Sequence, residues 1–291
     1  MANETTTTTL TEIIQREAYQ AAAYAYQAVA VMPPLVSKAD LTEKPTLTAR
    51  FPVFNALTAE AVSEGADYTS AQAVDTGNSV DVTVSEHIVR LMVTDLSEDA
   101  ATLDMARVRG IQVGKAMAER VDKDLTALFG GLDASAGSAT GSLTVALFQE
   151  AVIELEKNNI PRPYYAVIHP KQWGDLIGSL ASYNTFGEVG EEAIKTGRVG
   201  RLHGVDIYIT GNVPTATVDS NTVYSGAIFN PEAIAFAWKG EIPTIEVQRD
   251  ASLRAFEVVG IGVWGEAEYR GGSAADGIGG AGVNLYSNAT S

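Results

Sequence analysis

A long extended arm followed by a long helix is the feature of this sequence that most restricts its fold. Residues 46–54 (TLTARFPVF) and 80–93 (VDVTVSEHIVRLMV) both have apolar patterns typical of β-strands, and a polar stretch separates them. A two-stranded hairpin is only marginally stable in water, so this one must lie on another surface. Residues 96–129 contain no proline and carry a helical apolar stripe, which predicts a helix roughly 50 Å long. An arm that reaches out from such a rod indicates a subunit stabilised in part by its neighbours.

The composition excludes several classes of protein. The 291 residues carry a formal net charge of −16, so the chain lacks the large cationic surface of a sequence-reading nucleic-acid binder. The absence of cysteine excludes disulfides, thiolate nucleophiles and Cys-based metal sites. The three histidines lie far apart in the sequence and none has the spacing of a metal-binding pair. Neither a metal nor a cofactor is therefore expected.

The amino-terminal residues predict a helix that packs on another part of the protein. Residues 10–32 carry a weak helical stripe of mostly small residues, which Pro33-Pro34 ends. The segment 18–37 is free of charge, so a transmembrane span has to be considered, but its alanines, tyrosines and glutamines favour a packing helix. Residues 33–45 are then expected to form an extended connector.

The rest of the chain predicts an α+β fold with mixed sheets. Residues 132–143 are a Gly/Ser/Ala linker, residues 181–200 a glycine-punctuated loop, and residues 271–282 a flexible glycine-rich tail. The apolar patterns predict helices over 144–157 and 170–180, and strands over 164–169, 205–210, 222–229, 242–248 and 253–269.

No residue pattern in the chain predicts catalysis. Residues 260–265 and 277–282 match GxGxxG, but neither stretch leads into the helix that a dinucleotide site requires. Glycines inside a strand more often mark bends or close backbone contacts. His169, between a predicted buried strand and Pro170, is expected to be structural. A soluble enzyme of unrecognised class remains the least favoured alternative.

Several segments resemble the major capsid proteins of tailed phages with the Hong Kong 97 fold. Residues 197–214 (GRVGRLHGVDIYITGNVP) resemble a segment of that family's A-domain, and residues 164–177 (YYAVIHPKQWGDLI) resemble its strand-then-helix unit. Residues 226–250 and 253–269 resemble its closing strands, and the order of elements also agrees. The resemblance covers nearly the whole chain, and its weight comes from that order together with residues 197–214.

The resemblance implies a domain organisation and a function. Residues 1–44 would be the N-arm, 45–93 an extended β-hairpin called the E-loop, and 94–143 the spine helix of the P-domain with a linker. Residues 144–230 would form the mixed-sheet A-domain, and 231–291 the P-domain strands, the return to the A-domain and the tail. Such a protein is not an enzyme. It self-assembles into hexamers and pentamers of an icosahedral virion shell, formed in the host cytoplasm, that encloses double-stranded DNA without sequence-specific binding and without a membrane.

The same resemblance suggests where subunits meet. Three apolar residues are expected to anchor the E-loop on a neighbour, namely Phe51, Val53 and Phe54, and Phe51→Asp is expected to abolish closed shells. Three acidic residues near the tip are candidates for salt contacts across subunits, namely Glu60, Glu64 and Asp67. The A-domain loop would place its tip at the centre of each capsomer through Gly187, Gly190, Gly197, Arg198 and Arg201.

The chain departs from some members of the family. No lysine lies between Pro45 and Arg90, so the isopeptide cross-link that some members form through E-loop lysines is not expected. The segment before the E-loop is too short for an attached scaffolding region, so scaffolding is expected to be a separate protein or unnecessary. A portal and possibly a cement protein are further expected partners. The main alternative is an encapsulin-type cellular compartment, in which the amino-terminal helix would face the cargo.

Overall fold

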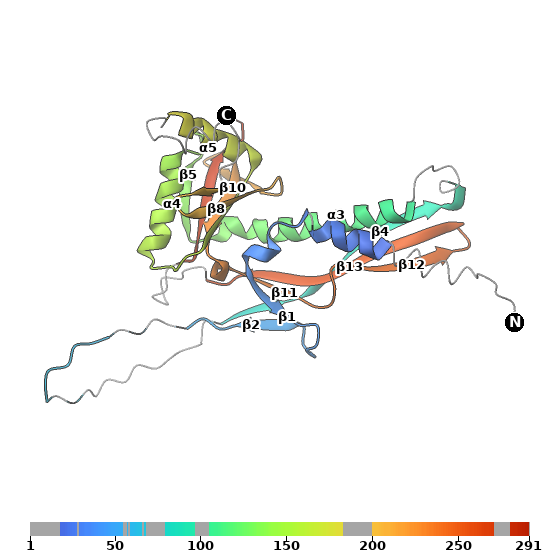
Figure 1. Cartoon of the computed structure of the whole chain (residues 1–291), viewed down its shortest axis with the longest axis horizontal. Helices are drawn as coiled ribbons and strands as arrows, with labels where there is room; N and C mark the ends of the chain where they lie inside the picture. Colours follow the sequence, from blue (N-terminus) through green and yellow to red (C-terminus); the bar gives the residue numbers. More distant parts are fainter. Residues whose placement is uncertain are drawn as a thin grey trace.

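The computed structural model is elongated, with two β-sheets joined through one long helix (Figure 1). It describes residues 18–27, 29–54, 57, 59–65, 67, 79–96, 105–182, 200–270 and 280–290, with the side chains of residues 105–106 and 181–182 left aside. The five-stranded sheet and the helix α3 (Met105–Ala127) form the long body, and the seven-stranded sheet stands at one end of it. Residues 59–65 extend away from both sheets. The chain is α+β, as predicted.

The five-stranded sheet is built around one long strand, β13 (Ala255–Glu268). On one side β13 pairs with β4 (Ser85–Thr94), and on the other with β12 (Thr244–Asp250) and β11 (Ile234–Trp238), all antiparallel. The edge strand β1 (Ser37–Asp40) runs parallel to β11. Residues 33–45 are therefore not a plain connector, because they contain the short 3-10 helix η1 (Pro33–Leu35) and a strand of the sheet.

The predicted hairpin is real but much shorter than expected. Only β2 (Thr48–Phe51) and β3 (Val80–Thr83) pair with each other. The strand is interrupted at Val84. The residues after it form β4, which pairs with β13 and not with the hairpin. Residues 46–54 and 80–93 therefore do not form one long two-stranded ribbon. The break allows one segment to contribute to two different sheets.

The predicted helix of residues 96–129 is confirmed over Met105–Ala127, which is about 34 Å of α-helix. It ends in the 3-10 helix η2 (Leu128–Gly131), and residues 97–104 lie outside the described part of the chain. One side of α3 is buried through Val113, Met117, Val121 and Leu125. The amino-terminal packing helix is confirmed over residues 18–27, here called the arm helix, which lies along α3 (Figure 1). Within the described residues, no helix has both the length and the apolarity to cross a membrane.

The seven-stranded sheet contains one strand from the predicted linker and one strand that begins where the predicted tail of residues 271–282 ends. Its strands are, in order, β5 (Ala134–Ser138), β14 (Gly282–Asn288), β10 (Asn221–Phe229), β6 (Tyr164–Ile168), β8 (Val205–Ile209) and β7 (Arg201–Leu202), with β9 (Thr215–Val218) also paired to β10. The expected linker contains β5 (Ala134–Ser138), which runs parallel to β14 (Gly282–Asn288). Since β14 is buried between β5 and β10, the chain after Gly282 is part of the core rather than a flexible tail. Residues 271–279 lie outside the described part.

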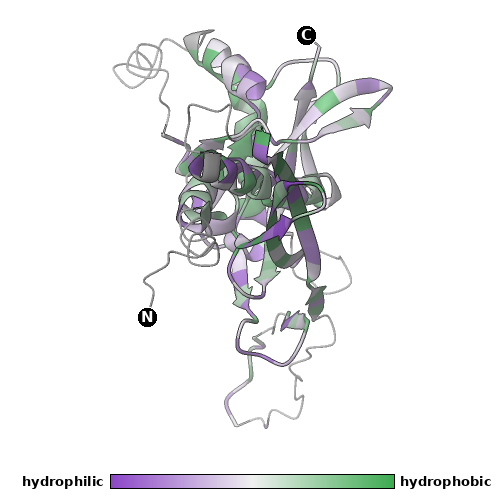
Figure 2. Cartoon of the chain, turned by 90° about the vertical axis from the view of Figure 1, so that its right-hand side faces the viewer, coloured by the Kyte–Doolittle hydropathy of each residue, from purple (hydrophilic) through white to green (hydrophobic). Residues whose placement is uncertain are grey.

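The remaining elements follow the predictions closely. They are α4 (Val145–Lys157), β6 (Tyr164–Ile168), α5 (Pro170–Ser182) and β8 (Val205–Ile209), with the two-residue β7 (Arg201–Leu202) added. The predicted strands 242–248 and 253–269 correspond to β12 and β13, whereas β9 and β11 were not predicted separately. Apolar residues gather on the strands in the middle of the molecule (Figure 2). One large core cluster spans both sheets and includes Phe129, Phe229 and Trp264.

Candidate assembly surfaces

The base of the loop between β2 and β3 is fixed to the body of the subunit. The ring of Phe51 packs against that of Tyr269, with 5.3 Å between centroids. The Tyr269 hydroxyl donates a 2.9 Å hydrogen bond to the carbonyl oxygen of Pro52. Across the two strands, Arg50 and Asp81 form a bidentate ion pair with two N···O distances of 2.7 Å, and Arg50 lowers the pKa of Asp81. The loop therefore leaves the subunit from a defined base.

Phe51, which was predicted to contact a neighbouring subunit, is buried in its own chain. Only 9% of it is exposed, and it packs in a cluster with Val82 and with Ala235 of β11. Val53 is half-buried. An aspartate at position 51 would disturb this cluster, so Phe51→Asp would test the folding of the loop base together with assembly.

Beyond its base, the loop exposes apolar and acidic side chains. Phe54, Leu57 and Val62 are 54%, 58% and 49% exposed. The acidic candidates Glu60, Glu64 and Asp67 are exposed as well. Leu57 and Val62 were not predicted as contacts, because each stands alone in the sequence among small and polar residues. These apolar side chains are available to a partner, unlike Phe51.

A second exposed apolar surface lies on β4, on the side of the sheet away from α3. Ile88 and Met92 are 58% and 43% exposed, and Ile88 lies opposite Ile261 of β13. Arg90, which lies between them on the same face, forms an ion pair with Glu257. This surface was not predicted, because residues 85–93 were expected to belong to the hairpin of the arm and not to the central sheet.

The predicted A-domain tip is described only at its last residue. Gly187, Gly190, Gly197 and Arg198 lie outside the described residues. Arg201 starts β7 and forms a 3.0 Å ion pair with Asp206 of β8. This pair belongs to the sheet of the same subunit.

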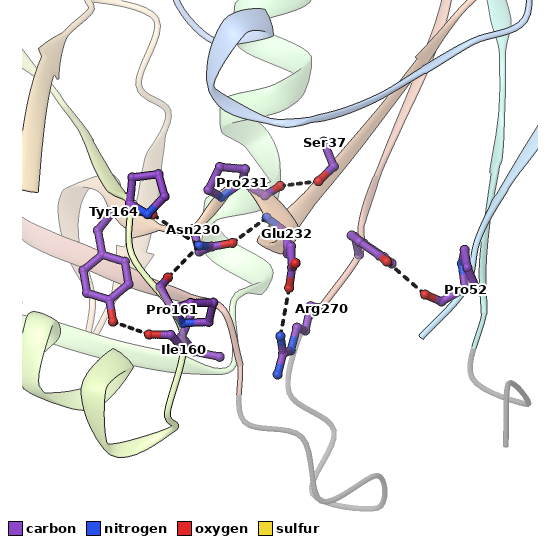
Figure 3. Close-up of polar contacts among 11 residues, drawn as sticks. Ser37, Pro52, Ile160, Pro161, Tyr164, Asn230, Pro231, Glu232 and Arg270 are labelled. Atoms are coloured by element: carbon purple, nitrogen blue, oxygen red, sulfur yellow. Dashed lines mark hydrogen bonds and ion pairs between the residues drawn. The ribbon is translucent and has the colours of Figure 1, made fainter. Parts of the chain in front are cut away.

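The chain crosses between the two sheets at Asn230, which the sequence analysis did not single out (Figure 3). Its side-chain nitrogen donates to the carbonyl oxygens of Pro161 (2.8 Å) and Pro163 (3.2 Å), and its side-chain oxygen accepts from the backbone N–H of Glu232 (2.9 Å). Arg270, at the second crossing, forms a 2.9 Å ion pair with Glu232. The Asn-Pro sequence was the available signal, because it marks turns of this kind.

The described part of the chain offers no evident catalytic centre. It contains no group of three or more side chains that could hold a metal ion. The ring of His169 stacks on Tyr224 with 3.7 Å between centroids, and its Nδ1 accepts a hydrogen bond from the backbone N–H of Lys171. Burial lowers the pKa of His169, which favours the neutral, structural histidine that was predicted.

The first GxGxxG stretch lies inside β13, and its glycines allow close contacts. A Cβ atom at Gly260 would lie 2.2 Å from the side chain of Val113 on α3, and one at Gly265 would lie 2.2 Å from the carbonyl oxygen of Thr83. The predicted close backbone contact is confirmed at Gly265, whereas the neighbour of Gly260 is a side chain.

Comparison with known proteins agrees with this architecture. The family model for phage capsid proteins matches residues 77–275, whereas none of the curated proteins matches the sequence. A structure from Mycobacterium phage Che8 is 22% identical, with a TM-score of 0.64 over 88% of this chain and 90% of that one. The capsid of cyanophage P-SCSP1u is 17% identical, with a TM-score of 0.68 over 89% and 88%. A virus-like particle from Pyrococcus furiosus is 11% identical, with a TM-score of 0.60 over 93% and 98%.

The structural similarities establish the fold, which is that of Hong Kong 97-type phage capsids. The family match covers well over half of the 291 residues, from the base of the hairpin to the second crossing between the sheets. The chain belongs to the phage capsid protein family.

Proposed function

We propose that this capsid protein forms the hexamers and pentamers of an icosahedral shell that encloses the double-stranded DNA of a tailed phage. One observation supports this most directly: the β2–β3 loop is fixed at its base, yet leaves Phe54, Leu57 and Val62 in water. Several exposed apolar side chains along one projecting segment are candidates for burial on a partner. When the same contact repeats around closed symmetry, weak individual contacts add up to a stable shell.

The domains of the family are proposed to map onto the chain as its resemblance implies. Residues 1–44 act as the N-arm, 45–93 as the E-loop, 94–143 and 231–270 mainly as the P-domain, and 144–230 as the A-domain. Residues 134–138 and 282–288 add strands to the A-domain sheet. In this arrangement the Ile88–Met92 surface is a candidate contact for the loop of a neighbouring subunit.

The remaining expectations also belong to this proposal. The acidic chain encloses DNA without reading its sequence, performs no catalysis, and occupies the virion after assembly in the host cytoplasm. A separate scaffolding protein, a portal and a cement protein are its further partners. The acidic residues Glu60, Glu64 and Asp67 contribute salt contacts between subunits, and the loop with Gly187, Gly190, Gly197 and Arg198 lies at the capsomer centre.

The test is assembly of variants that change only exposed side chains of the loop. Phe54→Asp and Leu57→Asp should give folded subunits or capsomers but no closed shells, as seen by negative-stain electron microscopy and sedimentation velocity. Ile153→Asp is the matched control, because Ile153 is 47% exposed on α4, away from the loop. Normal shells from both loop variants, or equal loss of shells in the control, would contradict the proposal.

A second candidate, an encapsulin-type compartment, is favoured by the similarity to the virus-like particle from Pyrococcus furiosus. The contents of shells purified from the native source separate the two functions. Packaged double-stranded DNA supports the phage shell, and a single enclosed protein in place of DNA supports the compartment.

A further inference from the structure

We infer that Asp122 is the positioning residue of the amino-terminal arm, because it holds the end of the arm helix against α3, beside a turn of the seven-stranded sheet. The inference rests on the proposed function, since it concerns how the arm is presented during assembly.

The arm helix sits with its backbone against α3. Gly110 and Gly114, one turn apart on α3, face Ala18 and Ala22, one turn apart on the arm helix. A Cβ atom at either glycine would lie 2.2 Å from the carbonyl oxygen of the facing alanine. Ala18 and Ala22 are 1% and 0% exposed, and they share a cluster with Val113. The fit is close, but it buries only small side chains and so cannot hold the arm strongly by itself.

Asp122 holds the chain where the arm helix ends. Among the described residues, the last backbone hydrogen bond of the helical pattern runs from Ala30 N–H to Tyr26 O, at 2.9 Å. The next two N–H groups donate to the Asp122 carboxylate: Val31 at 3.1 Å to both oxygens, and Met32 at 2.9 Å. Pro33 and Pro34 follow and have no N–H to donate. The carboxylate thus satisfies the donors that the end of the arm would otherwise leave unsatisfied.

A residue next to this carboxylate belongs to the other sheet. The side chain of Asn212, in the turn between β8 and β9, lies beside Asp122 and lowers the pKa of its carboxyl. One turn along α3, the Thr126 hydroxyl donates a 2.9 Å bond to the carbonyl oxygen of Asn212. Asp122 is 0% exposed; burial raises its pKa, and the bonds from Met32 and Val31 oppose that shift. Withdrawal of the arm would leave this buried carboxylate short of donors, so the arm is expected to be docked or released as a unit.

The opposite side of the arm helix is packed loosely. An open groove of about 540 Å³ separates it from the edge of the five-stranded sheet, lined among others by Tyr19, Tyr26, Lys38 and Trp238. A hydrogen bond from Tyr19 to Glu241 crosses this groove. On this side the arm helix is joined to the body through Tyr19 and through Tyr26, which packs against the large core cluster.

The test is hydrogen–deuterium exchange of the unassembled subunit, followed by assembly of the same preparation. Asp122→Asn keeps the shape of the side chain but replaces one acceptor oxygen by an NH₂ group, which is a donor. This group would face the N–H groups of Val31 and Met32 or the side chain of Asn212, so at least one hydrogen bond to the arm would be lost. The amides of residues 18–32 should exchange at least tenfold faster, and the shells should change in yield or size. Glu119→Gln, on the exposed side of α3, is the matched control and should change neither.

Unchanged exchange in Asp122→Asn, or faster exchange with normal shells, would overturn the inference. A measurement on the unaltered chain covers the case in which the variant does not fold. In the unaltered chain, the Val31 and Met32 amides should be protected from exchange as strongly as amides inside α3. Fast exchange at these two positions would show that Asp122 does not hold the end of the arm helix. If the unaltered protein forms no shells even when a scaffolding protein is supplied, the proposed function fails, while the exchange data still decide whether Asp122 holds the arm.

Discussion

Replacement of Gly114 by alanine should push the arm helix off α3, although alanine is the better helix former. In an exposed helix interior, alanine is more favourable than glycine by about 1 kcal/mol. At Gly114, however, the new Cβ would lie 2.2 Å from the Ala22 oxygen and 2.8 Å from its Cα. Both atoms are backbone, so no side chain can rotate away. The arm helix must recede until the 2.2 Å contact reaches ordinary contact at 3.4 Å or more.

The size of the effect follows from a comparison with α5. Gly178 lies in the interior of that helix, and within the described part of the chain a Cβ built there would have no atom within 4 Å apart from its chain neighbours and its own helix backbone. Gly178→Ala should therefore stabilise the subunit by about 1 kcal/mol. The gain in helix propensity cancels between the two variants, so their difference measures the contact with the arm helix. Overpacking of this kind costs about 1–3 kcal/mol.

Urea denaturation of the unassembled subunit measures this difference, and exchange of the amides of residues 18–27 shows where it arises. Gly178→Ala should raise the free energy of unfolding, whereas Gly114→Ala should lower it or leave it unchanged while the arm amides exchange faster. If Gly114→Ala stabilises the subunit as much as Gly178→Ala does, the close contact between the arm helix and α3 is refuted.

Two further predictions concern buried polar groups. Gln172 donates to the carbonyl oxygens of Tyr224 (3.2 Å) and Leu285 (3.0 Å) and accepts from His169 N–H (3.1 Å), so Gln172→Met should lower the free energy of unfolding by about 1–3 kcal/mol. A loss below about 0.5 kcal/mol in urea denaturation would mean that these bonds contribute little. Burial, and then the charge of Asp124, raises the pKa of Glu266 above its ordinary value of 4.5. Such a carboxyl destabilises the folded state as the pH rises above its unfolded-state pKa, because it is then ionised in the unfolded chain but resists ionisation in the folded one. Glu266→Gln should therefore raise the free energy of unfolding at pH 7, and this gain should disappear as the pH falls to 4.5. An equal gain at both pH values would contradict the prediction.

The elements predicted best from the sequence are those whose signals are local. Thr144 caps α4, where its side chain accepts from Leu147 N–H. His169 and Gln172 form the start of α5, directly after the apolar strand β6. Such caps, prolines and apolar runs act within a few residues, so they can be recognised without knowledge of the rest of the fold.

The strands β5 and β14 could not be predicted in the same way. Residues 134–138 (ASAGS) are small and have little preference for a strand, and their partner lies in residues 283–287. Even the glycine has a tertiary reason, because a Cβ atom at Gly137 would lie 2.1 Å from the carbonyl oxygen of Tyr286. Pairing over such a sequence distance overrides local propensity.

The candidate contacts show the same division. The alternation of Ala49 and Phe51 indicated one covered face of β2, but not whether the cover belongs to the same chain or to a neighbour. Tyr269, which is more than 200 residues away in sequence, supplies that cover and fixes the loop at Pro52. Because Phe51 is covered by its own chain, we propose that the exposed Phe54 and Leu57 anchor the loop on a neighbouring subunit.

The sequence by itself determined that this chain has a long helix, an extended apolar arm, an acidic charge and no recognisable catalytic motif, because composition and short-range periodicity carry that information. Only the tertiary structure decided which side chains cover one another: Phe51 inside and Phe54 outside, β4 in the central sheet, and Val31 and Met32 on Asp122. The physical reason is that burial and hydrogen bonding depend on residues brought together from distant parts of the chain, and one sequence pattern is compatible with several partners until the chain has folded.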